Sequence, residues 1–259
     1  MLDSGIYLGD CIDLMAELED KSIDCIICDL PYAKTHNEWD TVIPFEDLWK
    51  AYDRVIKDNG AIVLFGQGNF SAQLICSNLK EYRYTLIWNK VRTSGFLNAK
   101  RMPLPQHEDI MVFYKKLSTY NPQMWEGDKP SHKRGKKNEA LGIMQTKGKV
   151  YGKYVAYDDL PSTHTNMKYP TSILTFQNKV VGNVHPTQKP VDLMEWLVKT
   201  YTNEGELVLD NCMGSGSTGV ACKHTNRLFK GSMERTEMLH LWQTFYRAYG
   251  FEAFRRNAC

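Results

Sequence analysis

The sequence predicts an α/β protein whose mostly parallel sheet is doubly wound, with one long region inserted into it. Three observations support this fold class. Short, continuous apolar segments bounded by turn residues are typical of strands that are buried on both faces. Segments with helical periodicity separate these strands, which is the arrangement of repeated βαβ units. A glycine-rich turn also joins one strand directly to a helix in the last quarter of the chain.

Strands and helices alternate over the first 114 residues. Residues 22–28 form one continuous apolar run, and residues 59–66 form another that opens and closes with turn residues. Residues 45–57 place apolar side chains with the period of a helix. Further strands are expected at residues 6–8, 84–88 and 110–114, and further helices at residues 13–18 and 70–79.

The middle of the chain lacks this order. Residues 118–181 show no sustained period and are rich in Lys, Gly, Asn, Thr and Tyr. Within them, residues 129–153 carry eight Lys or Arg and a single acid, Glu139. Such a run forms either a solvated loop or a surface that contacts phosphates, and composition does not separate the two.

Regular structure is expected again from residue 185 onward. Residues 185–202 begin with a proline-containing turn and continue as an amphipathic helix. Residues 205–225 combine a strand, a glycine-rich turn and a helix. The last strand and the last helix are expected at residues 228–233 and 237–249.

The composition is that of an ordinary globular protein, with 259 residues of which 42% are hydrophobic and 24% charged. The formal net charge of +2 does not indicate a polyanion partner, so a nucleic-acid surface has to come from local clusters. No apolar run reaches the roughly 18–20 residues of a membrane span. The N-terminus also lacks the pattern of a signal peptide. We therefore expect a cytoplasmic protein that does not contact a membrane.

The seven cysteines are an odd number at irregular spacing, which argues against a disulfide framework and favours a reducing compartment. Cys25 and Cys28 form a C-x-x-C pair inside an expected strand. Side chains three positions apart on a strand point to opposite faces, so this pair cannot hold one metal ion. No second pair completes four ligands either. We therefore expect buried structural thiols and no metal site.

The strand, turn and helix at residues 205–225 carry a candidate nucleoside-binding turn. Its glycines follow the pattern Gly214-x-Gly216-x-x-Gly219, which allows close approach of the backbone to a ligand at a helix N-terminus. Asp210 lies at the carboxyl end of the strand, where ligands bind in open α/β sheets. An acid about 20 residues further on commonly holds ribose hydroxyls, and Glu234 has that spacing from Gly214. NAD, FAD and S-adenosylmethionine all use such turns, whereas the missing Gly-Lys-Ser/Thr ending disfavours a P-loop.

A second candidate site, Asp29-Leu30-Pro31-Tyr32, follows the expected strand at residues 22–28. The exocyclic amine of adenine or cytosine is a poor nucleophile because its lone pair is shared with the ring. A carboxylate and a backbone carbonyl that accept its N–H groups return electron density to the nitrogen. An aromatic ring can stack on a base flipped out of the duplex. Asp29, the Leu30 carbonyl held by Pro31, and Tyr32 fit these roles, although a strand-ending turn explains the tetrapeptide alone equally well.

Together these motifs resemble those of the S-adenosylmethionine-dependent DNA amino-methyltransferases that act on adenine N6 or cytosine N4. The order is that of the permuted beta group, whose catalytic motif precedes its cofactor loop. The family's D-P-P-Y corresponds to residues 29–32, its D-P-F-x-G-S-G-T to residues 210–217, and its H-P-T-Q-K-P to residues 185–190. The similarity covers residues 5–116 and 183–249. It implies a Rossmann-like methyltransferase sheet, and several motifs in order are more specific than one.

The resemblance implies roles for particular residues. The expected catalytic residues are Asp29, Leu30, Pro31 and Tyr32. The residues expected to hold S-adenosylmethionine are Asp10, Cys11, Asp29, Gln188, Lys189, Asp210, Asn211, Cys212, Gly214, Ser215, Gly216, Ser217 and Glu234. The residues expected to contact double-stranded DNA are Trp39, Asn98, Lys100, Arg101, Lys133, Arg134, Lys136 and Lys137. Packing in the core is an equally good explanation of Trp39.

Three departures from the family pattern affect these roles. Leu30 replaces the first proline, and because only its carbonyl is needed, activity should survive with a less rigid pocket edge. Asn211 and Cys212 replace Pro-Phe, which removes an aromatic ring near the cofactor. The family's F-x-G-x-E is met one residue late at Glu234. A bulge is therefore required, or Glu234 is not the ribose ligand.

The resemblance also divides the chain into three parts. Residues 1–92 would be the catalytic part and residues 182–259 the cofactor-binding part of one methyltransferase domain. Residues 93–181 would form an inserted target-recognition region, which favours phosphate contact by the basic run at residues 129–153. The implied partner is double-stranded DNA. The family also allows two protein partners, a second copy in a homodimer and a separately encoded cognate restriction endonuclease.

Aspartate at the first position of the tetrapeptide is more usual in enzymes that act on adenine. We therefore expect transfer of a methyl group to adenine N6 in DNA with base flipping, and cytosine N4 is the alternative. Methyltransferases of RNA or of protein glutamine amides usually begin this tetrapeptide with Asn and place it after the glycine loop. A non-catalytic DNA-binding relative would show a damaged tetrapeptide or glycine turn, and both are intact here.

Overall fold

The computed structural model describes residues 5–32, 42–128, 166–177 and 188–233. Its chain divides into two compact units. The larger combines residues 1–121 with residues 171–259, and the smaller comprises residues 122–170. In the smaller unit, β6 (Trp125–Glu126) pairs antiparallel with β7 (Met167–Lys168).

One eight-stranded sheet forms the centre of the larger unit. Its strands in spatial order are β1 (Gly5–Leu8), β10 (Leu228–Met233), β9 (Leu207–Asp210), β2 (Ile23–Cys28), β3 (Ile56–Gly66), β5 (His107–Phe113), β4 (Tyr82–Asn89) and β8 (Ile173–Thr175). Five neighbouring pairs are parallel, and only β5 runs antiparallel to its two neighbours. The predicted mostly parallel sheet is confirmed.

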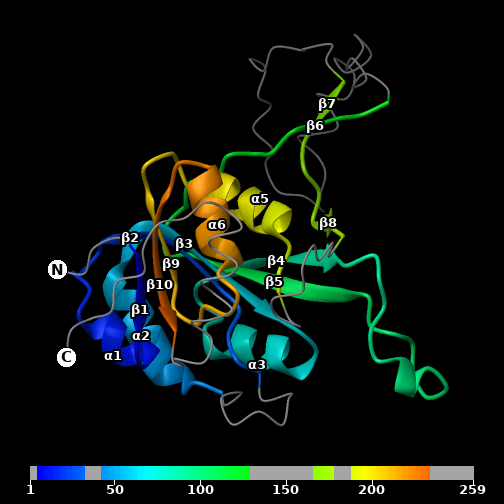
Figure 1. Ribbon diagram of the computed structural model, residues 1–259, viewed down its shortest axis with the longest axis horizontal. Helices are drawn as coiled ribbons and strands as arrows, with labels where there is room; N and C mark the ends of the chain where they lie inside the picture. The colour runs from blue at the N-terminus through cyan, green and yellow to red at the C-terminus, as the bar shows by residue number, and fades with distance from the viewer. Residues whose placement is uncertain (1–4, 33–41, 129–165, 178–187, 234–259) are drawn as a thin grey trace, which may run out of the picture. The chain divides into compact units, whose positions relative to one another are not determined.

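Helices cover both faces of this sheet (Figure 1). The helices on one face are α1 (Cys11–Ala16), α2 (Phe45–Val55) and α3 (Asn69–Ser77). Those on the other face are α5 (Val191–Tyr201) and α6 (Ser217–His224). Each layer buries its own apolar cluster against the sheet. The fold is therefore doubly wound, as the alternation of strands and helices predicts.

Side chains of β2 alternate between these two clusters. Cys25 and Ile27 pack beneath α5 and α6, whereas Ile26 and Cys28 pack beneath α1 and α2. The two cysteines of the C-x-x-C pair therefore lie on opposite faces, as the strand period predicts. Within the described part of the chain, no group of three or more His, Cys, Asp or Glu side chains is placed to hold a metal ion.

The structure corrects the sequence analysis at two strands. β3 starts at Ile56, directly after α2, because residue 56 already pairs with Ile23. β8 lies in the stretch that showed no period, and it pairs parallel with β4 through Ile173 and Ile87. Three residues are too few for a period of two to be visible. The helix expected at residues 237–249 lies outside the described residues.

The strand directions bring the two predicted motifs to one edge of the sheet. β2 and β9 are parallel neighbours, so Asp29, just after β2, and Asp210, at the end of β9, share the carboxyl edge.

No helix among the described residues is long and apolar enough to cross a bilayer.

Candidate active site

Asp29 follows the last residue of β2 and presents a partly buried carboxylate at the edge of the sheet. Both of its oxygens accept hydrogen bonds. The Tyr32 hydroxyl donates to Oδ1, and the Lys189 ammonium donates to Oδ2 at 2.5 Å. The carboxylate is therefore held in one orientation by two donors that lie far apart in sequence.

Tyr32 closes the tetrapeptide with its ring on Phe70 of α3, at 4.7 Å between ring centroids and a 35° tilt. Leu30, between Asp29 and Tyr32, is buried in the core beneath α1 and α2. Burial and the nearby Asp29 carboxylate both raise the pKa of Tyr32 well above its ordinary value. Tyr32 therefore acts as a neutral hydrogen-bond donor at physiological pH.

Lys189 is a buried cation between two carboxylates. Its ammonium lies 2.5 Å from Asp29 Oδ2 and 3.2 Å from Glu108 Oε2. It also lies over the rings of Phe65 and Trp88, 5.0 and 5.9 Å from their centroids. Burial lowers the pKa of Lys189, but the two carboxylates outweigh that effect and raise it above the ordinary value. The ammonium is therefore charged.

Glu108 extends this network to a second lysine. It is the second residue of β5, and its Oε1 accepts from the Lys90 ammonium at 3.1 Å. Burial raises the pKa of Glu108, but Lys189 and Lys90 together lower it below its ordinary value. Asp29, Glu108, Lys189 and Lys90 thus form a network of two negative and two positive charges.

The glycine turn starts from Asp210, whose buried carboxylate ends β9. The Thr218 hydroxyl donates to its Oδ2 at 2.6 Å, and the Cys212 backbone N–H donates to its Oδ1 at 3.3 Å. Burial raises the pKa of Asp210 to about 6, although the bond from Thr218 opposes the shift. Next in the chain, the buried Asn211 side chain accepts from the Tyr52 hydroxyl of α2 at 2.6 Å.

The turn itself leaves room beside its backbone. Gly216 caps α6 with a φ of +82°, a conformation that disfavours other residues. A Cβ atom added to Gly214 would meet no other atom within 4 Å, so the backbone there borders open space. The Ser217 hydroxyl donates to the Lys189 backbone carbonyl at 2.8 Å. Lys189 therefore contacts both Asp29 and the glycine turn.

Comparison with known proteins identifies the family to which this chain belongs. A family model described as DNA methylase, covering both N6 and N4 enzymes, matches residues 23–243. The chain belongs to this DNA methylase family. Its curated relatives include the type II methyltransferase M1.MboII of Moraxella bovis, 27% identical over 87% of this chain and 90% of the relative. M.HpaI of Haemophilus parainfluenzae is also 27% identical, over 87% of this chain and 68% of the relative.

Solved structures share the fold of this methylase. The M1.HpyAVI–SAM complex superposes with a TM-score of 0.61 at 22% identity, covering 93% of this chain and 98% of that one. The PvuII DNA methyltransferase, described as cytosine-N4-specific, has a TM-score of 0.63 at 15% identity, covering 95% of this chain and 87% of that one. The chain is therefore a DNA methyltransferase with a Rossmann-like methyltransferase fold, and its cofactor is S-adenosylmethionine.

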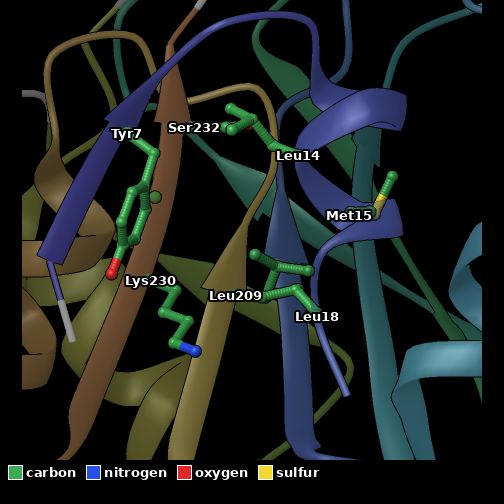
Figure 2. A pocket seen from close by; sticks show the side chains of 8 residues that line it. Tyr7, Leu14, Met15, Leu18, Leu209, Lys230 and Ser232 are labelled. Carbon is green, nitrogen blue, oxygen red and sulfur yellow. The ribbon is translucent and has the colours of Figure 1, made fainter. Parts of the chain in front are cut away.

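The residues of the glycine turn fit that cofactor. Gly214 borders open space, the N-terminus of α6 follows at Ser217, and Asp210 ends the adjacent strand. These are the features that let a backbone approach a nucleoside ligand. A second hollow, beneath α1 and lined by residues such as Tyr7, Leu14, Leu209 and Lys230, encloses only about 10 Å³ (Figure 2). That volume holds about one water molecule and is too small for the cofactor.

The other site residues predicted from the sequence lie in several parts of the methylase, and some lie outside the described residues. Asp10 caps α1, accepting from the backbone N–H groups of Ile12 at 2.8 Å and Asp13 at 3.2 Å, and Cys11 opens that helix. Ser215 bonds Ser217 through their hydroxyls at 3.1 Å, and Gln188 precedes the clamped lysine. The predicted residues that lie outside the described part are Trp39, Lys133, Arg134, Lys136, Lys137 and Glu234. Asn98, Lys100 and Arg101 are exposed on the loop between β4 and β5.

Sequence reasoning missed Glu108 and Lys90. Neither residue is among the site residues expected from the sequence. Its role depends on β5 running antiparallel, which brings the start of β5 to the same edge as the end of β2. The only local signal was the pair of acids, Glu108 and Asp109, directly before an apolar run.

Proposed function

We propose that this DNA methylase methylates the exocyclic N6 amine of adenine in double-stranded DNA, with the target base flipped out of the duplex. The observation that carries the proposal is the clamped carboxylate of Asp29, joined through Lys189 to the glycine turn. A hydrogen-bond acceptor for the amine and a nucleoside-binding turn must lie close together for direct methyl transfer. Lys189 links both in one site.

Asp29 and the Leu30 carbonyl accept the two N–H groups of the amine in this proposal. S-adenosylmethionine supplies an electrophilic methyl group. The two acceptors would draw the nitrogen lone pair out of the ring as attack begins. The bond from nitrogen to the methyl carbon would form as the bond from that carbon to the cofactor sulfur breaks, which leaves S-adenosylhomocysteine. The methylated amine would then release one proton to solvent water. Lys189 holds the Asp29 carboxylate in one orientation, and Tyr32 stacks on the base.

The Tyr32 hydroxyl already occupies part of the Asp29 carboxylate. In the protein alone it donates to Asp29 Oδ1, the oxygen that Lys189 does not bind. A carboxylate oxygen accepts up to two hydrogen bonds, so an amine hydrogen can reach Oδ1 beside the hydroxyl or after displacing it. We infer that in either case the aromatic ring remains available for stacking on the base.

The choice of adenine rests on the aspartate at the first position of the tetrapeptide, which resembles enzymes that act on adenine N6. Cytosine N4 is the second candidate, because the same acceptors suit its amine. Nucleoside mass spectrometry of treated DNA distinguishes the two products. N6-methyladenine is the expected product, and N4-methylcytosine alone would refute the choice of base.

We also propose that residues 93–181 recognise the target sequence. Residues 1–92 and 182–259 would then form the catalytic and cofactor-binding parts of one domain. The named relatives are type II methyltransferases. This favours a role in DNA modification, with a restriction endonuclease encoded separately. The methylase would act either as a homodimer or as a single chain. Sequencing of methylated DNA from a host that expresses the chain would give the target. A variant with the basic run at residues 129–153 neutralised should lose DNA affinity but keep cofactor affinity.

A further inference from the structure

The loop between β4 and β5 forms an arm, residues 90–106, that projects beyond the ends of both strands (Figure 1). Backbone hydrogen bonds close its base. The N–H of Lys90 donates to the Gln106 carbonyl, and that of Ser94 to the Pro105 carbonyl, both at 2.9 Å. The tip is the short 3₁₀ helix η1 (Phe96–Asn98), which follows Gly95 with a φ of +73°. The arm is thus an ordered turn held on a rigid hairpin.

Two large apolar residues, adjacent in sequence, are exposed at this tip. Phe96 is 80% exposed and Leu97 is 96% exposed, and Met102 nearby in the arm is also exposed. Single exposed apolar residues are common on proteins. An adjacent pair on an ordered turn is different, because no element in the described part of the chain shields it from water. A partner that buries the tip would therefore recover hydrophobic free energy.

The charge around the tip restricts the chemistry of that partner. Arg92, Lys100 and Arg101 are exposed, and residues 90–107 contain no Asp or Glu. Lys90, at the base of the arm, is paired with Glu108 and is not part of this surface. A partner with phosphates outside and flat apolar faces inside matches this pattern, and duplex DNA has both. Arms of two copies meeting tip to tip would instead bring like charges together.

The arm also starts beside the active site. β4 is parallel to β2, because both β3 and β4 run antiparallel to β5 and β3 is parallel to β2. The arm therefore leaves the same edge of the sheet that carries Asp29. Glu108, two residues after the arm, binds Lys189, which in turn binds Asp29.

We propose that Phe96 and Leu97 insert into the base stack next to the target base and hold the duplex open during methyl transfer. The inference deepens the proposed function and rests on DNA methylation with base flipping. Extruding a base costs stacking and pairing, and apolar side chains that enter a base step offset this cost. Arg92, Lys100 and Arg101 hold the flanking phosphates while the tip enters.

The test compares Phe96→Ser/Leu97→Ser with Leu117→Ser. Leu117 is 81% exposed but follows the carboxyl end of β5, at the opposite edge of the sheet, so it is a matched control. Single-turnover methyl transfer is measured on a duplex containing the mapped target, and on the same duplex with a mismatch opposite the methylated base. The mismatch lowers the cost of extrusion, so a wedge should matter less there.

The double variant should lose on the order of tenfold in rate on the paired duplex and recover to within about threefold of the wild type on the mismatched one. Leu117→Ser should match the wild type on both. Equal losses on the two duplexes, or no loss on either, would overturn the proposal. So would a sedimentation mass of the double variant lower than that of the wild type, which would make the tip a self-association surface. The assay places the mismatch opposite whichever base is methylated. A cytosine product would therefore refute the choice of adenine, but the comparison of the two duplexes would still test the role of Phe96 and Leu97.

Discussion

Lys189 and Asp29 lie 160 residues apart in the chain and form an ion pair with 2.5 Å between Nζ and Oδ2. The backbone carbonyl of the same lysine accepts from Ser217 in the glycine turn. One residue therefore fixes the carboxylate proposed to be catalytic relative to the turn proposed to bind the cofactor. Because Lys189 is buried and also paired with Glu108, its ammonium has little freedom to leave this position.

Asp29→Ala should abolish methyl transfer, because it removes the acceptor that activates the amine. Loss of one such electrostatic group typically costs on the order of a hundredfold or more in rate. Affinity for S-adenosylmethionine, measured by calorimetry, should change far less, because the glycine turn is intact. Asp47→Ala, at an exposed carboxylate of α2, is the control. Near-normal turnover by purified Asp29→Ala would refute the proposed catalytic role of Asp29.

Replacements of Tyr32 should separate its hydroxyl from its ring. Tyr32→Phe removes the donor to Asp29 Oδ1 but keeps a ring against Phe70, so its transfer rate should stay near that of the wild type. Tyr32→Ala also removes stacking on the base, which typically costs about 1–3 kcal/mol, or roughly 5- to 150-fold.

Tyr84→Phe is the matched control, because it loses a hydroxyl bonded to Tyr201 at 3.0 Å away from the site. Single-turnover rates should therefore rank the wild type, Tyr84→Phe and Tyr32→Phe together, above Tyr32→Ala. If Tyr32→Phe were as slow as Tyr32→Ala, the hydroxyl rather than the ring would be required.

Gly214→Val should weaken cofactor binding without unfolding the protein. A Cβ there meets nothing within 4 Å among the described residues and Gly214 has no positive φ, so the fold should tolerate the substitution while a bound ligand should clash with it. Calorimetry should show a loss of more than about tenfold, or about 1.4 kcal/mol. Gly216 is a poorer choice, because its φ of +82° would strain any replacement. Unchanged affinity in a folded Gly214→Val protein would mean that the open space holds no cofactor.

Cofactor affinity should also depend on pH through Asp210. Its pKa is raised to about 6 by burial, so the carboxylate takes up a proton as the pH falls through that value. If only the ionised form accepts bonds from the cofactor, affinity at pH 5.5 should be about fourfold lower than at pH 7.5. Asp210→Asn should remove this dependence, and calorimetry at both pH values is the measurement. A wild-type affinity equal at both pH values would contradict the role.

The sequence contained enough information to predict most of the fold, because continuous apolar strands and helical periods are local signals. β8 was missed because a strand of only three residues, Ile173–Thr175, is too short to show a period of two. The same limit applies to the site. Asp29, Tyr32 and the glycine turn carry their chemistry in adjacent residues, so their motifs are visible. Glu108 acquires its role only from the direction of β5 and the position of Lys189, and neither is encoded locally.

Glu108 should make the stability of the methylase depend on pH below neutrality. Its pKa is lower in the folded protein than in the unfolded chain, so the unfolded chain binds more protons as the pH falls. The stabilisation is thus fully present above the unfolded value of about 4.3 and is lost as the pH falls through the folded value. Glu108→Gln should lower the free energy of unfolding at pH 7 and flatten its decline in acid, measured by urea titration at several pH values. The exposed Glu204→Gln should behave as the wild type does. If Glu108→Gln kept the full acid dependence, the carboxylate would contribute nothing through Lys189 and Lys90, and the four-charge network would not stabilise the site.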